Sequence, residues 1–307
     1  MHRRRALMSS FLLASISVVA VACPPTGPGG GTGGTLPAPV DNSAGSYFDP
    51  TNLPIGDYHL TATTPQKGWI LRCSTNVQTG GAGADGPWIR SNGTFDLANK
   101  LKVQGSVSWP AANVSITTTA SQRIITGNAL PVGSTTGTFP IQPSDPAYAY
   151  DRNPNSIAAQ TVSISLPLNP TIGTTPRCLT GGPIAYAVHG VPIFDGFDAG
   201  GRDAVAHEVQ DACDGHPQQS GMYHYHSSSN CIPGNSNTTS TLIGYALDGF
   251  GIYNRFDQSG HELSNDDLDE CHGTTSPVLW NGSVQNVYHY VATQAFPYTL
   301  GCFKGAA

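Results

Sequence analysis

The sequence contains few charged residues, which make up 11% of its 307 residues and leave a formal net charge of -6. Nucleic-acid-binding domains carry basic patches that neutralise phosphates, and a mildly acidic chain with so few charges provides none. Two catalytic signatures are missing as well: no Gly-x-Ser-x-Gly elbow occurs, and the glycine-rich stretch 27–34 lies in a segment without strand or helix patterning. We therefore expect no nucleic-acid partner, no serine nucleophile and no nucleotide cofactor.

Helical periodicity is nearly absent after residue 40. Instead, short runs rich in Val, Ile, Thr and Tyr alternate with clusters of Gly, Pro, Asn and Ser. Residues 160–166 alternate strictly, with Val162, Ile164 and Leu166 on one face, as a half-buried strand requires. Further strand candidates are residues 68–71, 102–107 and 113–116. The pattern predicts a mainly β fold, an antiparallel sandwich- or barrel-like domain with long loops.

The N-terminus has the form of an export signal. Basic residues 2–5 precede an uncharged, mostly apolar run, residues 6–22, which ends at Cys23. A membrane-spanning helix needs about 20 consecutive apolar residues, so this run is short for a span, and it leads directly into Pro24 and Pro25. We therefore expect export rather than a transmembrane helix.

The three small residues before Cys23 resemble the lipobox of bacterial lipoproteins, although Ala20 stands where a leucine is usual. The resemblance implies that residues 1–22 are a lipoprotein signal peptide. It also implies that the thiol of Cys23 carries a lipid, which anchors the protein to a membrane of the cell envelope. Ordinary secretion, with cleavage after Ala22, is the alternative.

Residues 23–45 are rich in Gly, Pro and Thr without periodicity, so they bury little apolar surface and we expect a flexible tether. The β-rich domain is expected over residues 46–307. It contains six of the seven cysteines and no Cys-x-x-Cys pair, which argues against zinc ribbons and thioredoxin-like motifs. An even number of cysteines in an exported domain is typical of disulfides, although the number alone leaves the pairing open.

A degenerate internal repeat begins near residue 184. The aligned stretches are residues 184–194 with 243–253, and the Tyr-His-Tyr of residues 223–225 with that of residues 288–290. We infer two copies of one supersecondary unit, over residues of about 184–232 and 243–303.

The repeat also suggests how the cysteines pair, because each copy has one cysteine before its Tyr-His-Tyr and one after it. The predicted disulfides within the copies are Cys213–Cys231 and Cys271–Cys302. The remaining pair, Cys73–Cys178, then joins the N-terminal β region to the repeat region. A bond between Cys213 and Cys271 would contradict this scheme.

A family resemblance is carried by four strings: GMYHYHSSSNC, IGYALDGFGIY, DLDECHG and the ending YHYVATQAFPYTLGCFKG. They resemble the YHYH domain family of exported proteins. Upstream, TGTFP and DRNPNSIAAQ are similar to earlier segments of that family, so the resemblance spans roughly residues 127–305. It implies domain boundaries and export, but no particular activity. The second copy departs from the family pattern, because Val291 stands where a histidine is often repeated, and this predicts an incomplete site there.

The histidines of the motif alternate with tyrosines. On a β-strand successive side chains point to opposite faces, so His224 and His226 share one face and the tyrosines share the other. Two imidazoles on one face can reach one metal ion, and His-x-His is a frequent metal-binding pattern. With the cysteines oxidised, the ligands would be imidazole with or without carboxylate. This set suits copper, which we favour, and then zinc or iron.

Further ligands must come from elsewhere in the fold. The candidates are His207, His189 and His289. A metal site usually also needs groups that hold an imidazole through its second nitrogen. The candidates for this role are Asp211, Glu208 and Asp248, the last of which takes the place of His189 in the second copy. The histidines expected in solvated loops are His216, His261 and His272.

Three functions fit these residues. The first is a metal-binding module of the cell envelope that captures, buffers or delivers a transition metal ion. The second is a metal-dependent hydrolase or oxidase, in which an open coordination position accepts water or substrate. The third is a structural or adhesive surface domain without a metal. The metal content of the purified protein separates the third function from the other two.

Overall fold

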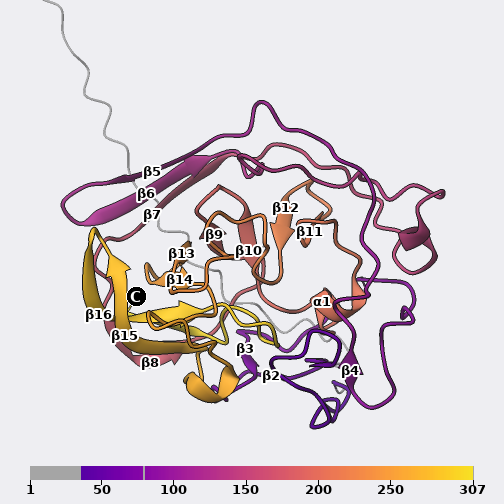
Figure 1. Ribbon diagram of the computed structural model, residues 1–307, viewed down its shortest axis with the longest axis horizontal. Helices are drawn as coiled ribbons and strands as arrows, with labels where there is room; N and C mark the ends of the chain where they lie inside the picture. Colours follow the sequence, from indigo (N-terminus) through magenta and orange to yellow (C-terminus); the bar gives the residue numbers. More distant parts are fainter. Residues whose placement is uncertain (1–35, 79, 307) are drawn as a thin grey trace, which may run out of the picture. The chain divides into compact units, whose positions relative to one another are not determined.

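The computed structural model describes residues 36–78 and 80–306 (Figure 1). The predicted signal peptide and Cys23 lie outside the described residues. Strands make up 31% of the described residues and helices 4%, which confirms the prediction of a mainly β protein. The helical elements of the described part are α1 (Ala204–His207), the 3-10 turn η1 (Pro146–Ala149) and the 3-10 turn η2 (Asn265–Asp267). Within residues 36–306, no helix has the length and apolar character that crossing a membrane requires.

An eight-stranded sheet forms the centre of the domain. From one edge to the other its strands are β11 (Gly215–Pro217), β12 (Tyr223–Tyr225), β10 (Pro192–Phe194), β9 (Pro183–Ala187), β13 (Leu242–Ala246), β14 (Gly251–Tyr253), β16 (Ser283–Val291) and β15 (Gly273–Trp280). Within the described chain, β11 and β15 each pair on one side only. The sheet is therefore open, and of the two expected architectures the sandwich-like one is confirmed and the closed barrel is wrong.

The two halves of this sheet have the same strand order when each is followed from the middle to its edge. Strands β9 and β13 pair antiparallel in the middle, and β10 and β14 pair antiparallel with them on the outside. Strands β12 and β16 then run parallel to β10 and β14, and β11 and β15 form the antiparallel edges. The two parallel pairs make the sheet mixed, and the other pairs of this sheet are antiparallel as expected. The sequence repeat itself stays a prediction, and its two segments supply the two halves.

A three-stranded antiparallel sheet packs beside the central sheet (Figure 1). Its strands are β5 (Val114–Thr118), β6 (Gln122–Gly127) and β7 (Val162–Pro167). In β7, Val162 and Leu166 are buried and Ile164 is half-buried, so the predicted alternation of this strand is confirmed. These side chains form an apolar cluster with Ile125 of β6 and Tyr186 of β9, which holds the two sheets together.

Short strand pairs complete the fold. They are β1 (Leu53–Pro54) with β4 (Thr94–Phe95), β2 (Leu60–Thr61) with β3 (Ile70–Leu71), and β8 (Ile172–Arg177) with β17 (Phe303–Gly305). Strands β2, β3 and β4 lie on the side of the central sheet away from β5, β6 and β7 (Figure 1). Leu53, Ile70 and Phe95 of these pairs are fully buried in the main core, together with side chains of the central sheet.

The strand expected over residues 102–107 is not formed. Val103 and Val107 make only isolated bridges. Between them, Gly105 has a φ of 113°, which lies outside the extended region that a strand needs. A continuous ladder of hydrogen bonds therefore cannot run through this segment.

Three disulfides join the chain: Cys73–Cys178, Cys213–Cys231 and Cys271–Cys302. These are the pairs that the sequence predicts. The first bond ties the segment after β3 to the segment before β9. The second encloses β11 and β12, and the third encloses β15 and β16, so each half of the central sheet has its own disulfide at its edge.

Candidate metal centre

Strands β11 and β12 form a short antiparallel hairpin, and its turn contains Gly221 with a φ of 84°. The register of the hairpin sets His216 directly opposite His224. Directly opposed residues of an antiparallel pair project from the same face, with Cβ atoms about 4.5–5.5 Å apart. His226 follows two residues after His224 and shares that face. The hairpin therefore gathers three imidazoles.

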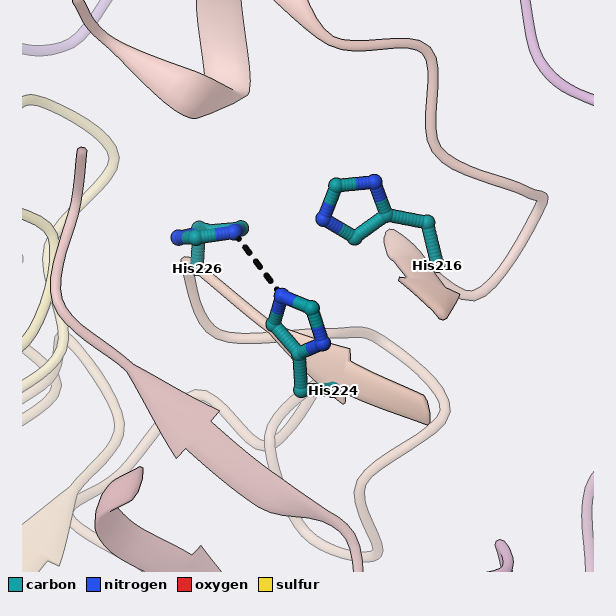
Figure 2. Close-up of side chains that lie close together, drawn as sticks. All are labelled: His216, His224 and His226. Atoms are coloured by element: carbon teal, nitrogen blue, oxygen red, sulfur yellow. Dashed lines mark hydrogen bonds between the residues drawn. The ribbon is translucent and has the colours of Figure 1, made fainter. Parts of the chain in front are cut away.

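These three imidazoles, the imidazole cluster, are compact and buried (Figure 2). The exposed fraction of each residue is only 3–4%, and no other part of the described chain has three metal-ligating side chains grouped in this way. The Nε2 atoms of His224 and His226 lie 3.1 Å apart, and one ring nitrogen of each of the three residues lies within 4.8 Å of the others. Two nitrogens bound to one metal ion at about 2.1 Å are roughly 3.0–3.4 Å apart at octahedral or tetrahedral angles. The His224–His226 pair already has this spacing.

Backbone carbonyls determine where the protons of these two rings sit. Nδ1 of His224 lies 3.1 Å from the carbonyl oxygen of Met222, and Nδ1 of His226 lies 2.5 Å from that of Asp195. A carbonyl oxygen only accepts hydrogen bonds, so each Nδ1 donates its proton and each neutral ring keeps its lone pair on Nε2. The two lone pairs therefore face each other inside the protein. Facing acceptors repel, so this contact is favourable only with a cation between them.

A shared proton does not supply that cation at neutral pH. Burial lowers the pKa of both His224 and His216 well below the usual value, and the neighbouring imidazoles lower it further. Burial lowers the pKa of His226 as well. The rings are therefore neutral at pH 7, which is the state in which an imidazole binds a metal ion. Phe194 of β10 stacks on His224 with ring centroids 3.9 Å apart and covers the pair.

A carboxylate lies next to the imidazole cluster. Glu208 follows helix α1, whose first turn is fixed by the side chain of Asp203, which accepts from two backbone N–H groups. Oε2 of Glu208 lies 3.5 Å from Nε2 of His216 and 3.6 Å from Nε2 of His226. Within residues 36–78 and 80–306, this oxygen and both ring nitrogens of His216 have no hydrogen-bond partner. Glu208 is therefore a candidate ligand, rather than a group that holds an imidazole through its second nitrogen.

Burial, together with the nearby charges of Asp198 and Asp151, raises the pKa of Glu208 well above its usual value. Without a cation close by, the carboxyl therefore keeps its proton to a higher pH than an exposed glutamate does. Lys100 is buried, which lowers its pKa to about 7, and its ammonium donates to the backbone carbonyl of Glu208 and to the side chain of Gln210. Lys100 thus fixes the segment that presents Glu208 without binding its carboxylate.

The imidazole cluster opens onto a cavity of about 570 Å³. The charged side chains that line it are Arg72, Asp151, Asp195, Asp198 and Glu208. Two of its carboxylates lie beside an arginine: Asp198 is 3.0 Å from Arg202, and Asp195 is 3.5 Å from Arg72. The other two, Asp151 and Glu208, have no arginine or lysine at ion-pair distance among the described residues. Ionised Asp151 therefore makes the cavity acidic without an ion, and Glu208 adds a second negative charge once a cation displaces its proton.

The tyrosines of the motif have partners on the other face of the strand. The hydroxyl of Tyr223 donates to Asp211 and lies 2.9 Å from both carboxylate oxygens. The hydroxyl of Tyr225 lies 3.0 Å from Nε2 of His189. His189 and Asp211, which the sequence assigns to a metal site, are therefore partners of buried tyrosines and do not belong to the imidazole cluster.

Two further predicted ligands also lie outside the cluster. His207 ends helix α1 and lies between two carboxylates, with ring nitrogens 2.9 Å from Asp57 and 2.9 Å from Asp85. Burial lowers the pKa of His207, but the contact with Asp57 outweighs it and raises the pKa above the usual value, so this imidazole favours a proton over a metal ion. His289 lies on β16 opposite Thr274 of β15, in the other half of the central sheet.

In that half, the positions that correspond to the imidazole cluster are occupied by Thr274, His289 and Val291. Only one of the three side chains is an imidazole, in keeping with the incomplete site that the sequence predicts. Asp248 does not hold an imidazole there: it accepts from the hydroxyl of Tyr290 at 2.6 Å.

His216 is the member of the imidazole cluster that sequence reasoning missed, and the prediction of a solvated loop for it is wrong. The same error applies to His272, which is 2% exposed and lies 2.9 Å from the hydroxyl of Thr293, whereas His261 is exposed as expected. A signal for His216 was present. It precedes a glycine-containing turn, and pairing the residues on either side of that turn as a hairpin brings it opposite His224.

Fold and cluster together define a disulfide-linked β domain with a buried three-histidine site. Residues 163–265 match the sequence model of the family described as YHYH protein, and this range includes the imidazole cluster and Glu208. The chain therefore contains a YHYH domain, and the family prediction is confirmed. No curated protein and no solved structure matches the chain.

Proposed function

We propose that this domain binds one divalent transition metal ion through the imidazole cluster, with Glu208 as an additional ligand. The observation that carries the proposal is the 3.1 Å distance between Nε2 of His224 and Nε2 of His226, because the carbonyl contacts of both Nδ1 atoms leave a lone pair on each Nε2. A metal ion between them turns a repulsive contact into two coordinate bonds. His216 joins by a small rotation of its ring, which breaks no hydrogen bond because its nitrogens have none within the described chain.

The charges of the cavity support the binding of a cation. Asp151 and Glu208 together carry two negative charges when both are ionised, and a divalent ion balances them. The carbonyl groups of Met222 and Asp195 support it as well, because they hold the Nδ1 atoms and so aim the Nε2 atoms of His224 and His226. Metal sites usually need such contacts behind their ligands.

Copper is the metal we favour, followed by zinc and iron. The six cysteines of the domain are in disulfides, so no thiolate is available, and imidazole with carboxylate suits all three metals. Among divalent first-row ions, a given set of nitrogen and oxygen ligands binds copper most tightly.

Metal analysis of the purified protein tests the proposal. After loading with Cu(II) and dialysis, the wild-type protein is expected to retain about one ion per chain. The double variant His224→Ala, His226→Ala is expected to retain none, because it removes the facing pair. His289→Ala is the matched control, since His289 is also buried, with 2% exposure, and lies outside the cluster. A folded wild-type protein that retains no Cu, Zn, Fe or Mn would refute the proposal and leave a structural or adhesive domain.

We also propose that the protein is exported and held at a membrane of the cell envelope by a lipid on Cys23. The basic and apolar N-terminal segment supports export, and the disulfides support an oxidising compartment, where such bonds form and persist. Labelling of cells with a fatty acid tests the anchor. The wild-type protein is expected to take up the label and to sediment with membranes, and Cys23→Ala to do neither. An unlabelled wild-type protein would rule out the lipid.

A further inference from the structure

The cavity beside the imidazole cluster is much larger than a metal ion requires. Its volume is about 570 Å³, whereas one water molecule accounts for roughly 30 Å³ of the liquid. A metal ion with one or two waters therefore leaves most of the cavity to another molecule. Pockets that bind small organic molecules have volumes of about 300–1,000 Å³. A centre that only stored metal would not need this space.

The wall around the cluster leaves a coordination position to that molecule. Apart from its charged side chains, the cavity is lined largely by glycines and by side-chain amides such as Asn76, Asn153 and Asn155. Amide oxygens suit calcium or magnesium better than copper or iron, so these groups are poor competitors for the metal. Copper(II) and iron accept more than four ligands in tetragonal or octahedral geometry. A position on the cavity side is therefore left to water or to a bound molecule.

Asp195 provides a second, independent sign of a ligand in this cavity. Its side chain is buried, with the residue 4% exposed, and within the described chain its Oδ2 atom accepts no hydrogen bond. The other oxygen accepts from the backbone N–H of Phe197, and the backbone carbonyl accepts from His226, so the residue is fixed beside the cluster. A buried carboxylate oxygen without a donor is costly. A hydroxyl of a bound molecule can supply the donor.

Arg72 supplies the complementary charge. Its Nε atom lies 3.5 Å from Oδ2 of Asp195, which is too far for a hydrogen bond, and its guanidinium lines the cavity. Guanidinium groups bind carboxylates through two parallel hydrogen bonds. Once a divalent ion balances Asp151 and Glu208, the wall no longer repels an anion.

We propose that the metal-loaded centre binds a small 2-hydroxycarboxylate in this cavity, an inference that rests on the proposed metal site. Arg72 binds the carboxylate of the ligand, Oδ2 of Asp195 accepts from its hydroxyl, and one ligand oxygen takes the open position on the metal ion. In such a molecule the carboxylate and the hydroxyl are on adjacent carbons. They can therefore reach Arg72 and Asp195, which are neighbours in the cavity wall. The chemical class thus follows from two neighbouring side chains and one metal.

Protein loaded with Co(II) provides the test, because the visible absorption of Co(II) reports its ligands. Lactate is expected to change the spectrum in a saturable way, and propionate, which lacks the hydroxyl, to bind at least about tenfold more weakly. Arg72→Ala is expected to weaken the binding of both acids. Asp195→Asn is expected to weaken lactate and to change propionate little. Arg177→Ala is the control, because Arg177 donates to the carbonyl of Gly305 and does not line the cavity.

The outcomes separate the two proposals. If the wild-type protein retains no Co(II) and none of Cu, Zn, Fe or Mn, the metal site and this inference both fail; if it retains Cu(II) but not Co(II), the same titrations are followed in the visible absorption of Cu(II). If Co(II) is retained and lactate leaves the spectrum unchanged, only this inference fails, and equal affinities for lactate and propionate overturn it too. Elemental analysis of Arg72→Ala and Asp195→Asn is expected to find the Co(II) content of the wild type, so that weaker lactate binding reports the cavity wall and not a lost metal.

Discussion

Removal of the disulfide Cys213–Cys231 perturbs the imidazole cluster while leaving every candidate ligand in place. The bond joins cysteines 18 residues apart, and the closed segment contains β11, β12 and all three imidazoles. Strand β11 has three residues and, within the described chain, pairs only with β12. His216 therefore depends on the hairpin and its disulfide. His224 and His226 depend on it less, because β12 also pairs with β10 and backbone carbonyls hold both rings.

The magnitude follows from the length of the closed loop. If a disulfide acts by restricting the unfolded chain, a loop of 18 residues contributes about 3.2 kcal/mol and the 31-residue loop of Cys271–Cys302 about 3.7 kcal/mol. Without Cys213–Cys231, the hairpin has to be ordered when the metal binds. This ordering reduces the free energy of metal binding by up to that 3.2 kcal/mol. This corresponds to a rise in the Kd for Cu(II) of up to about 200-fold. Cys271–Cys302 encloses no residue of the cluster, so its loss costs slightly more stability and no affinity.

The assay compares Cys213→Ala, Cys231→Ala with Cys271→Ala, Cys302→Ala. The Kd for Cu(II) is measured by competition with a chelator, at a temperature where circular dichroism shows both proteins folded. Electron paramagnetic resonance of bound Cu(II) counts the coordinating nitrogens, and we expect one fewer in the first variant, because His216 is released. Equal affinities in the two variants, or an unchanged nitrogen count in the first, would refute this reasoning.

Copper binding is expected to release up to one proton per chain, from Glu208, because burial raises the pKa of this carboxyl well above its usual value, whereas the imidazoles are already neutral. The affinity for copper then rises with pH until Glu208 is ionised in the free protein. Calorimetry in buffers of different ionisation enthalpy measures the number of protons released. Glu208→Gln is expected to release none. Copper at about 100 times its Kd is expected to stabilise the fold by about 2.7 kcal/mol and to raise Tm by roughly 5–10 °C, with no response from His224→Ala, His226→Ala in a thermal scan. Tyr223→Phe leaves Asp211 without its hydroxyl donor and is expected to cost about 1–3 kcal/mol in a denaturant titration; a loss of copper in that variant would contradict the separation of the two faces.

Local patterns in the sequence predict much of the fold. The alternation of Val162, Ile164 and Leu166 specifies a half-buried strand, because a side-chain period of two is a property of the strand itself. The same period puts His224 and His226 on one face. The disulfides are predictable because each half of the sheet carries one cysteine on either side of its Tyr-His-Tyr. In each of these cases the relevant residues are close in sequence or related by an obvious pattern.

The rest of the site depends on contacts that no local pattern specifies. His216 is a ligand candidate only because of the hairpin register, and Glu208 only because the segment after α1 brings its carboxyl within 3.5 Å of His216. His207 lies one residue from Glu208, yet it contacts Asp57, which is 150 residues away in the chain. Composition around a histidine therefore does not reveal whether it faces a metal site or a structural carboxylate.

Comparison of the two halves of the sheet separates what the motif does for the fold from what it does for the site. Tyr223 donates to Asp211, and Tyr288 donates to Asp269 in the corresponding place, so the first tyrosine of the motif has the same kind of partner in both halves. The imidazole face differs, because the corresponding positions of the second half contain a single histidine. This tyrosine is therefore needed wherever the hairpin folds, since it anchors the hairpin to a carboxylate. The histidines are retained together only where the cavity and Glu208 are present, which is the distribution expected of side chains that serve a ligand rather than the core.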